Sequence, residues 1–241
     1  MVLRIEDLDR ARVRPEFEEA LLEDLAWFGL RWQEGPFRQS ERRKLYSAAW
    51  RKLRDAGLVY PCSCSRRDLL GAAAAPHAED EEPIYPGTCR PERVTTPNES
   101  SPAGANWRFR VPAGEALEFL DACAGPQRAI AGRDFGDFVV WRKDDVPAYQ
   151  LAAVVDDAAM EIAEVVRGTD LLLSTFRQLL LYRALGLTPP QFYHVPLIVD
   201  SLGKRLARRH DALSLRALRA RGLSPDDVRR QLLRPVHAQE I

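Results

Sequence analysis

The sequence predicts an α/β fold with a mostly parallel sheet that is covered by helices on both faces. Short apolar runs alternate along the chain with segments whose apolar residues recur at helical spacing, and this alternation favours parallel strands. The chain has 241 residues, of which 46% are hydrophobic and 29% charged. That length is enough to bury a substantial core, and that composition argues against wholesale disorder.

The first sixty residues are predicted to hold two helices between short strands. Pro15 suits the first turn of a helix, and Gly29 suits its end. Ser40 is a good N-cap for a second helix, which Gly57 would close. The expected elements are a buried strand at 2–5, a loop at 6–9, helices at 15–29 and 40–57, and a strand at 58–60.

The composition changes at residue 62. Residues 62–104 are rich in Ala, Pro, Glu and Ser, with an acidic run at 79–82. Such a stretch indicates an insertion or subdomain that is partly a flexible loop. Alternating apolar and polar residues then predict a half-exposed strand at 107–111, and a further strand is expected at 138–141.

The core resumes at Tyr149. Gly186 is expected to close a helix, and Ser224 with Pro225 is a typical helix start, followed by acids in the first turn. The expected elements are an apolar segment at 151–155, a strand at 162–166, a helix at 174–185, a strand at 194–199, a turn at 200–203 and a helix from 224.

Charge and cysteine content limit the class of protein. The 35 Lys plus Arg balance the 35 Asp plus Glu, so no global positive field attracts nucleic acid. From Asp200 to the end, however, ten basic residues face five acidic ones. The N-terminus is too charged for a signal peptide, no apolar run could span a bilayer, and four cysteines are too few for a disulfide scaffold. We therefore expect a soluble, cytoplasmic protein.

The cysteines suggest a structural zinc site. Thiolates bind Zn²⁺ tightly, and a small insertion lacks a core of its own. Ligand chemistry favours His77 as the fourth ligand, with Tyr85 as the less obvious candidate; the alternative is a set of ordinary reduced thiols. Cys123 stands apart and is expected to be a small buried hydrophobe. The three clustered cysteines are Cys62, Cys64 and Cys89.

Three further positions have residue types that suit ligand binding. Carboxylates at residues 6–9 follow a buried strand, where an α/β sheet usually binds a substrate ammonium group or a ribose hydroxyl. Arg167 ends another strand and is suited to bidentate pairing with a substrate carboxylate. Tyr149 precedes an apolar segment. The alternatives are solvated loop charges, a surface arginine and a packing tyrosine.

A basic loop is the last candidate. Four cations fall within the six residues 204–209, after a turn. This density suits a polyphosphate or an RNA backbone, although the glycines of a Walker loop are missing. The alternative is a solvated basic face.

Taken in order, these pieces resemble the catalytic domain of class I glutamyl-tRNA synthetases. They resemble more closely its stand-alone paralogue, glutamyl-Q tRNA(Asp) synthetase, over essentially the whole chain. The Cys-x-Cys and Tyr-x-x-x-Cys pair and the end of the chain soon after the basic loop favour that paralogue. The matching pieces are Arg4-Ile5-Glu6-Asp7-Leu8-Asp9, Cys62-x-Cys64, Tyr85-x-x-x-Cys89, Tyr149-Gln150-Leu151-Ala152, Val154-Val155-Asp156-Asp157, Glu164-Val165-Val166-Arg167-Gly168-Thr169-Asp170 and Arg205-Leu206-Ala207-Arg208-Arg209.

The resemblance implies a fold and an incomplete start. The fold would be a Rossmann-type parallel sheet of class I synthetases with an inserted small zinc-binding subdomain. Residues 1–60 would form a partial first half of the catalytic domain, 61–132 the insertion, and 133–241 the second half with the signature loop and C-terminal helices. The chain would open on the second core strand, without the first strand and helix that contain a His-x-Gly-His segment.

The resemblance also implies an activity. Glutamate would be activated with ATP and Mg²⁺ to glutamyl-adenylate and transferred to queuosine in the anticodon of tRNA(Asp), by a monomer. Glu6 would hold the ammonium group, with Tyr149 and Arg167 completing the glutamate pocket. Arg205 and Arg208 would act on the ATP phosphates. The implied zinc ligands are Cys62, Cys64, Tyr85 and Cys89.

Two departures leave alternatives open. Arg208 stands where the family's signature loop has a lysine, and arginine keeps the charge but changes the geometry. The His-x-Gly-His segment is absent. The alternatives are a fragment of a glutamyl-tRNA synthetase that charges tRNA(Glu), or a non-catalytic remnant that binds zinc or RNA.

Overall fold

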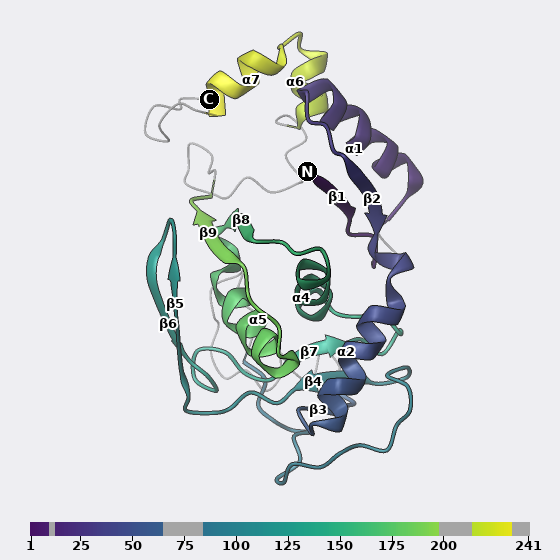
Figure 1. Ribbon diagram of the computed structural model, residues 1–241, viewed down its shortest axis with the longest axis vertical. Coiled ribbons are helices and arrows are strands. Elements are labelled where there is room, and N and C mark those ends of the chain that lie inside the picture. Colours follow the sequence, from purple (N-terminus) through teal and green to yellow (C-terminus); the bar gives the residue numbers. More distant parts are fainter. Residues whose placement is uncertain (10–12, 65–83, 198–213, 233–241) are drawn as a thin grey trace. The chain divides into compact units, whose positions relative to one another are not determined.

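The computed structural model describes residues 1–9, 13–64, 84–197 and 214–232, shown in Figure 1. The chain forms two compact units. The first unit comprises Met1–Glu41 and Pro196–Ile241, and the second comprises Arg42–Val195. Among the described helices, none is both long and apolar enough to cross a membrane.

The first unit contains a parallel pair of strands joined by a helix. Pro15 occupies the first turn of that helix, and Gly29 ends it in the left-handed conformation, as the sequence predicts. The strand expected at residues 2–5 is also confirmed. The elements are β1 (Val2–Ile5), α1 (Pro15–Phe28), β2 (Glu34–Arg38), the 3-10 turn η1 (Gln39–Glu41), α6 (Leu215–Ala220) and α7 (Pro225–Leu232).

Strand β2 was not predicted, because its sequence Glu-Gly-Pro-Phe-Arg has the composition of a turn. Gly35 allows it to pair. Its φ of +98° favours glycine, and a Cβ atom there would lie 2.4 Å from the Leu3 carbonyl oxygen. The register of β1 against β2 shifts at this position.

Helix α7 begins as the sequence predicts. The Ser224 hydroxyl accepts the Asp227 backbone N–H at 3.2 Å, and the Asp227 carboxylate accepts the Ser224 backbone N–H at 2.9 Å. This reciprocal arrangement satisfies two N–H groups at the helix start. The hydrogen bond from the Ser224 hydroxyl is the main cause that lowers the pKa of Asp227 to about 2.

The second unit combines an antiparallel sheet, a hairpin and a parallel pair. Strands β3, β4 and β7 form the antiparallel sheet, β5 and β6 the hairpin, and β8 and β9 the parallel pair. The elements are α2 (Arg43–Asp55), β3 (Val59–Cys62), β4 (Asn106–Phe109), β5 (Ala116–Asp121), β6 (Gly125–Ile130), β7 (Phe138–Trp141), α4 (Tyr149–Ala159), β8 (Glu164–Gly168), the 3-10 turn η2 (Thr169–Leu171), α5 (Leu172–Leu185) and β9 (Gln191–Val195).

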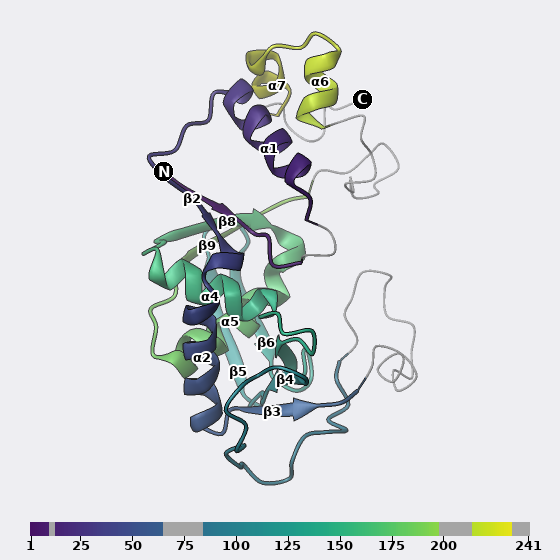
Figure 2. The same ribbon diagram turned by 90° about the vertical axis from the view of Figure 1, so that its right-hand side faces the viewer.

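Helices α2, α4 and α5 pack on one another in the second unit (Figure 2). Large aromatic side chains are buried in this unit, and Trp50 on α2 meets Trp107 on β4 edge to face at 4.8 Å between ring centroids. Asp156 is fully buried and accepts hydrogen bonds from the Tyr46 hydroxyl and from Arg42 Nε, both at 2.7 Å. These bonds compensate the cost of burying a carboxylate and tie α2 to α4.

Several boundaries differ from the prediction. The second helix starts at Arg43, because the Ser40 hydroxyl donates to the Asp7 carboxylate instead of capping. The apolar segment at 151–155 lies inside α4, and β9 occupies Gln191–Val195, with residues 198 and 199 outside the described residues. The β5–β6 hairpin was not predicted, and Cys123 in its turn is exposed, not buried.

The fold class is confirmed at the coarser level. The described residues mix helices with strands, and β1–β2 and β8–β9 are parallel. Their largest sheet, β3–β4–β7, is antiparallel, so a mostly parallel arrangement is not what the described residues show. This sheet unites strands from all three segments expected at 1–60, 61–132 and 133–241.

Candidate functional site

Arg167 lies near the carboxyl end of β8, and its guanidinium is held from two sides. It faces His194 across the parallel pair, and its Nε donates to His194 Nε2 at 3.0 Å. Its Nη2 donates to the Thr175 hydroxyl on α5 at 2.6 Å. The guanidinium carbon lies 5.3 Å from the ring centroid of Phe192, a cation–π contact. The arginine is therefore fixed by the fold.

Tyr149 is brought to Arg167. It is the first residue of α4, and its hydroxyl lies 3.4 Å from Arg167 Nη1. The side chain is 42% exposed, so the phenol remains accessible. Tyr149 and Arg167 are 18 positions apart in the sequence, and the structure brings these two predicted site residues together.

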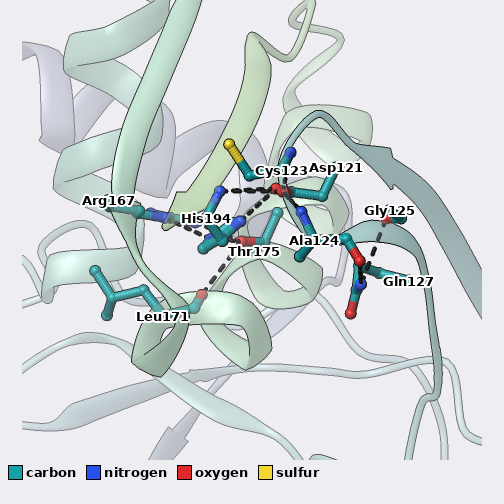
Figure 3. A network of polar contacts seen from close by, with 9 residues as sticks. All are labelled: Asp121, Cys123, Ala124, Gly125, Gln127, Arg167, Leu171, Thr175 and His194. Carbon is teal, nitrogen blue, oxygen red and sulfur yellow. Dashed lines mark hydrogen bonds and ion pairs between the residues drawn. The ribbon is translucent and has the colours of Figure 1, made fainter. Parts of the chain in front are cut away.

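Sequence reasoning missed the groups behind Arg167. Figure 3 shows the His194 ring between Arg167 and Asp121, the last residue of β5. His194 Nδ1 lies 2.6 Å from Asp121 Oδ2, and both side chains are fully buried. Neither residue has a local sequence signal, because only the pairing of β8 with β9 and the packing of the hairpin against β9 unite them.

Asp121 is held ionised by its hydrogen bonds. Burial acts to raise the pKa of its carboxyl, but the backbone N–H of Ala124, the His194 side chain and the backbone N–H groups of His194 and Cys123 outweigh it. The pKa of Asp121 is consequently well below its usual range. A buried anion is therefore in contact with His194, one of the side chains that hold Arg167.

The guanidinium keeps hydrogen-bonding capacity toward a ligand. An arginine has five N–H hydrogens in a planar fork. Among the described residues, His194, Thr175 and Tyr149 account for one each. The two that remain, on Nη1 and Nη2, suit a carboxylate, which takes two parallel N–H bonds.

Glu6 belongs to the first unit. It follows β1, its side chain is 47% exposed, and Arg4 Nη2 lies 3.2 Å from its carboxylate. The neighbouring Asp7 has a structural task, since its carboxylate accepts the Ser40 backbone N–H at 2.8 Å. Of the acidic residues at this strand end, Asp7 faces inward and Glu6 is accessible.

The three cysteines converge, as their spacing suggested. The sulfur atoms of Cys62, Cys64 and Cys89 all lie within 4.8 Å of one another, and those of Cys64 and Cys89 are 3.5 Å apart. The Tyr85 hydroxyl lies 3.5 Å from the Cys62 sulfur and 3.7 Å from that of Cys64. It also accepts the Cys89 backbone N–H at 2.7 Å.

This donor set fits a tetrahedral metal ion. Zinc–sulfur bonds of about 2.3 Å place two thiolate ligands about 3.8 Å apart, and a sulfur and an oxygen ligand about 3.5 Å apart. The observed separations between Tyr85, Cys62 and Cys64 are close to these values. A Cys62–Cys64–Cys89 cluster of this size could hold a metal.

Arg108 supports the cysteine cluster and was not predicted. It is buried on β4, its Nε donates to the Cys62 sulfur at 3.3 Å, and its Nη1 donates to the Asp137 carbonyl at 2.9 Å. Its guanidinium carbon lies 3.9 Å from the Tyr85 ring centroid. Arg108 therefore joins the cysteine cluster to the segment that precedes β7.

The cysteines differ in acidity. Burial acts to raise the pKa of the Cys89 thiol, but the Ser63 backbone N–H and the Tyr85 hydroxyl outweigh it and lower the pKa to about 6. Burial raises the pKa of the Cys64 thiol. Cys89 therefore supplies a thiolate at neutral pH, and the thiolate is the form that binds metal.

Three sequence-predicted residues lie outside the described residues. They are His77, Arg205 and Arg208.

Comparison with known proteins decides the family. The model for the catalytic domain of class I tRNA synthetases (E and Q) matches residues 1–238. The chain belongs to this family. A class I synthetase catalytic domain with mixed α/β content and parallel strands is thus shown by both sequence and structure.

The relatives of this class I synthetase chain carry glutamyl names. A Glutamyl-Q tRNA(Asp) synthetase from Symbiobacterium thermophilum is 49% identical, over 94% of this chain and 73% of that protein. Glutamate–tRNA ligase 2 of Nitrosococcus oceani is 42% identical, over 99% of this chain and 52% of that protein. A crystal structure of a glutamate tRNA ligase from Elizabethkingia meningosepticum superposes with a TM-score of 0.69 at 28% identity, covering 88% of this chain and 46% of that one.

Proposed function

We propose that this chain activates glutamate with ATP and Mg²⁺ and transfers the glutamyl group to queuosine in the anticodon of tRNA(Asp). The main support for the activation step is the guanidinium of Arg167, which is fixed beside Tyr149 and has two N–H hydrogens that the described residues leave unused. The names of relatives at 44–49% identity support the acceptor. The related glutamate–tRNA ligases are about twice as long as their matched part, so the activity of the whole protein is part of the proposal.

Arg167 and Tyr149 are proposed to bind glutamate, with Glu6 as the partner of its ammonium group. A carboxylate of glutamate would take the two remaining N–H hydrogens of Arg167. Glu6 has an accessible carboxylate that is suited to an ammonium ion. The reacting carboxyl group would then be held in one orientation, which is the main contribution of binding to the rate of adenylation.

Arg205 and Arg208 are proposed to stabilise the triphosphate of ATP. Adenylate formation develops negative charge on the leaving pyrophosphate, and fixed cations lower the energy of that state without proton transfer. The Mg²⁺ that accompanies ATP would share this role. In this proposal Arg208 stands where the family's signature loop has a lysine. Arginine keeps the positive charge but changes the geometry of the contact.

Cys62, Cys64, Tyr85 and Cys89 are proposed to hold Zn²⁺ as a structural ion. The converging thiols and the sulfur–oxygen distances support this set. When bound, zinc would fasten the end of β3 to the segment that contains Tyr85 and Cys89. The division into segments 1–60, 61–132 and 133–241 is proposed on this basis.

Replacing Tyr85 tests the fourth ligand. We expect Tyr85→Phe to lower zinc affinity about 10- to 100-fold, because it removes an oxygen ligand and keeps the ring. His77→Ala is the matched variant, and it should leave affinity unchanged. Competition with a chromogenic chelator measures both. If only His77→Ala lost zinc affinity, His77 and not Tyr85 would be the fourth ligand.

An exchange assay tests the activation step. Glutamate-dependent ATP–pyrophosphate exchange is expected without any tRNA, and glutamine or aspartate should not support it. Exchange that appears only after tRNA(Glu) is added would contradict the proposal and favour a glutamate–tRNA ligase. No exchange under either condition, with zinc or RNA still bound, would favour a non-catalytic protein.

A transfer assay tests the acceptor. Labelled glutamate should be attached to tRNA(Asp) that contains queuosine and not to the same tRNA without it. tRNA(Glu) serves as the competing acceptor. Label on tRNA(Glu) would contradict the proposed acceptor while leaving activation intact. We expect the active species to elute as a monomer.

A further inference from the structure

The geometry defines the protonation of His194. An arginine Nε can only donate a hydrogen bond, and Arg167 Nε lies 3.0 Å from His194 Nε2. His194 Nε2 must therefore offer a lone pair. The single ring proton then lies on Nδ1, which is 2.6 Å from Asp121 Oδ2. The arrangement is a carboxylate, a neutral imidazole and a guanidinium in series.

The surroundings support the same assignment. The Thr175 hydroxyl accepts from Arg167 Nη2 and lies 3.0 Å from His194 Nε2, closer than the Leu171 carbonyl oxygen at 3.2 Å, so its proton can be donated to the lone pair on Nε2. The rings of Phe119 and Phe192 lie 6.3 and 6.1 Å from the imidazole centroid. A proton on Nε2 would thus point at the N–H of Arg167 in a site without exposed surface on His194.

The two oxygens of Asp121 share the His194 backbone N–H, at 3.0 Å from Oδ1 and 3.2 Å from Oδ2, but differ in their other partners. Oδ1 also accepts the backbone N–H groups of Cys123 and Ala124 at 2.9 and 2.7 Å. Oδ2 also faces the imidazole N–H. One oxygen therefore holds the hairpin turn, and the other acts on the side chain of His194.

We propose that Asp121 and His194 are positioning residues for Arg167 in glutamate binding. The Asp121 carboxylate holds the proton of His194 on Nδ1. The lone pair on Nε2 then sets the plane of the Arg167 guanidinium, so that its outer N–H edge faces the ligand. This inference rests on the proposed role of Arg167. It adds two buried residues that do not touch glutamate but decide how well it is bound.

The substitution Asp121→Asn separates the two roles of the carboxylate. An asparagine keeps an oxygen for the turn and places an N–H group toward His194 Nδ1. The imidazole then accepts on Nδ1 and carries its proton on Nε2, against Arg167 Nε. A histidine held in the wrong tautomer loses its function although its position is unchanged. The KM for glutamate should rise about 10- to 100-fold in the exchange assay, with the KM for ATP unchanged.

Glu118→Gln is the matched control. It lies on the same hairpin, and its carboxylate forms an exposed ion pair with Arg128 at 3.0 Å. It removes one negative charge close to Asp121 in sequence without touching His194. The KM of this variant for glutamate and the tautomer of its His194 ring should equal those of the unmodified protein. An equal rise in KM in both variants would show a general charge effect and overturn the proposal.

Nitrogen-15 spectra of the histidine side chains give a readout independent of activity. The unmodified protein should show His194 with a protonated Nδ1 and an unprotonated Nε2, and Asp121→Asn should exchange the two. A protonated Nε2 in the unmodified protein at neutral pH would overturn the proposal, even if the variant fails to fold. So would an unchanged KM for glutamate in a folded Asp121→Asn variant with the exchanged tautomer.

Arg167→Ala distinguishes this inference from the function on which it rests. If Arg167→Ala leaves the KM for glutamate unchanged, the proposed glutamate pocket is wrong. If Arg167→Ala raises the KM and Asp121→Asn does not, the pocket stands and the positioning role is wrong.

Discussion

The cysteine cluster and the Arg167 cluster are both built into the second unit, but they balance charge differently. At the cysteine cluster, thiols converge on one point with Arg108 as a neighbouring cation. At the Arg167 cluster, each polar group already bonds to another side chain of the protein. The first arrangement suits an added cation, whereas the second balances its charge without one. The two clusters should therefore respond differently to chemical and genetic change.

Metal removal is expected to have the largest effect. Converging thiolates repel one another once a bound ion is gone, so a strong chelator should lower the unfolding free energy by several kcal/mol. Thermal unfolding with and without the chelator, together with metal analysis of reduced protein, measures this. Cys123→Ser is the control, since Cys123 is exposed and outside the cluster. Reduced protein that contains no zinc and unfolds at the same temperature with chelator would contradict the assignment.

The substitution Arg167→Lys is expected to have the second-largest effect. Lysine keeps the charge, but its three N–H donors lack the planar fork and cannot serve His194, Thr175 and both oxygens of a carboxylate together, so the KM for glutamate should rise about 10- to 100-fold. Fold stability should change little, because no buried charge is left unpaired. Arg183→Lys is the control, as Arg183 on α5 forms a partly exposed ion pair with Glu115. A normal KM for glutamate in Arg167→Lys would show that the planar fork is not required.

The same contrast explains what the sequence could predict. Cys62 and Cys64 are two positions apart and Cys89 lies 25 positions further on, so residue type and spacing were sufficient to suggest a cluster of thiols, although residue type alone favoured His77 over Tyr85 as its fourth member. His194 and Asp121 are 73 positions apart, and each resembles an ordinary polar residue in its own segment. Only strand pairing brings them together. Helices marked by Pro15, Gly29 and Ser224 were predicted for the same local reason as the cysteines.

Elements whose signals conflict locally were missed or misplaced. Strand β2 contains Gly35 in a turn-like sequence, yet it pairs because glycine permits close approach to Leu3. The Ser40 hydroxyl has two possible partners, and a tertiary contact with Asp7 prevails over helix capping. Sequence periodicity cannot weigh such contacts, since they depend on residues 33 positions away.

The pH dependence of Asp121 is expected to give a smaller effect. Its pKa is lower in the folded chain than in the unfolded one, so it contributes stability above its unfolded pKa of about 3.9 and loses it as the pH falls further. Asp121→Asn should be less stable by about 1.5 to 3 kcal/mol at pH 7, the usual worth of hydrogen bonds to a charged group. The difference should shrink below pH 4. Urea unfolding at pH 7 and pH 3 measures it, and a constant difference would contradict an ionised Asp121.

The smallest effect is expected for the ion pair between Arg183 and Glu115. Arg183 is 56% exposed and Glu115 is 36% exposed, so water screens their attraction. The hydrogen bond from Arg183 lowers the pKa of Glu115, but exposed pairs of this kind contribute less than about 1 kcal/mol. A double-mutant cycle with Arg183→Ala and Glu115→Ala should give a coupling below that value, and the coupling should vanish in high salt. If it equalled the cost of Asp121→Asn and persisted in salt, the distinction between buried networks and surface pairs would fail for this unit.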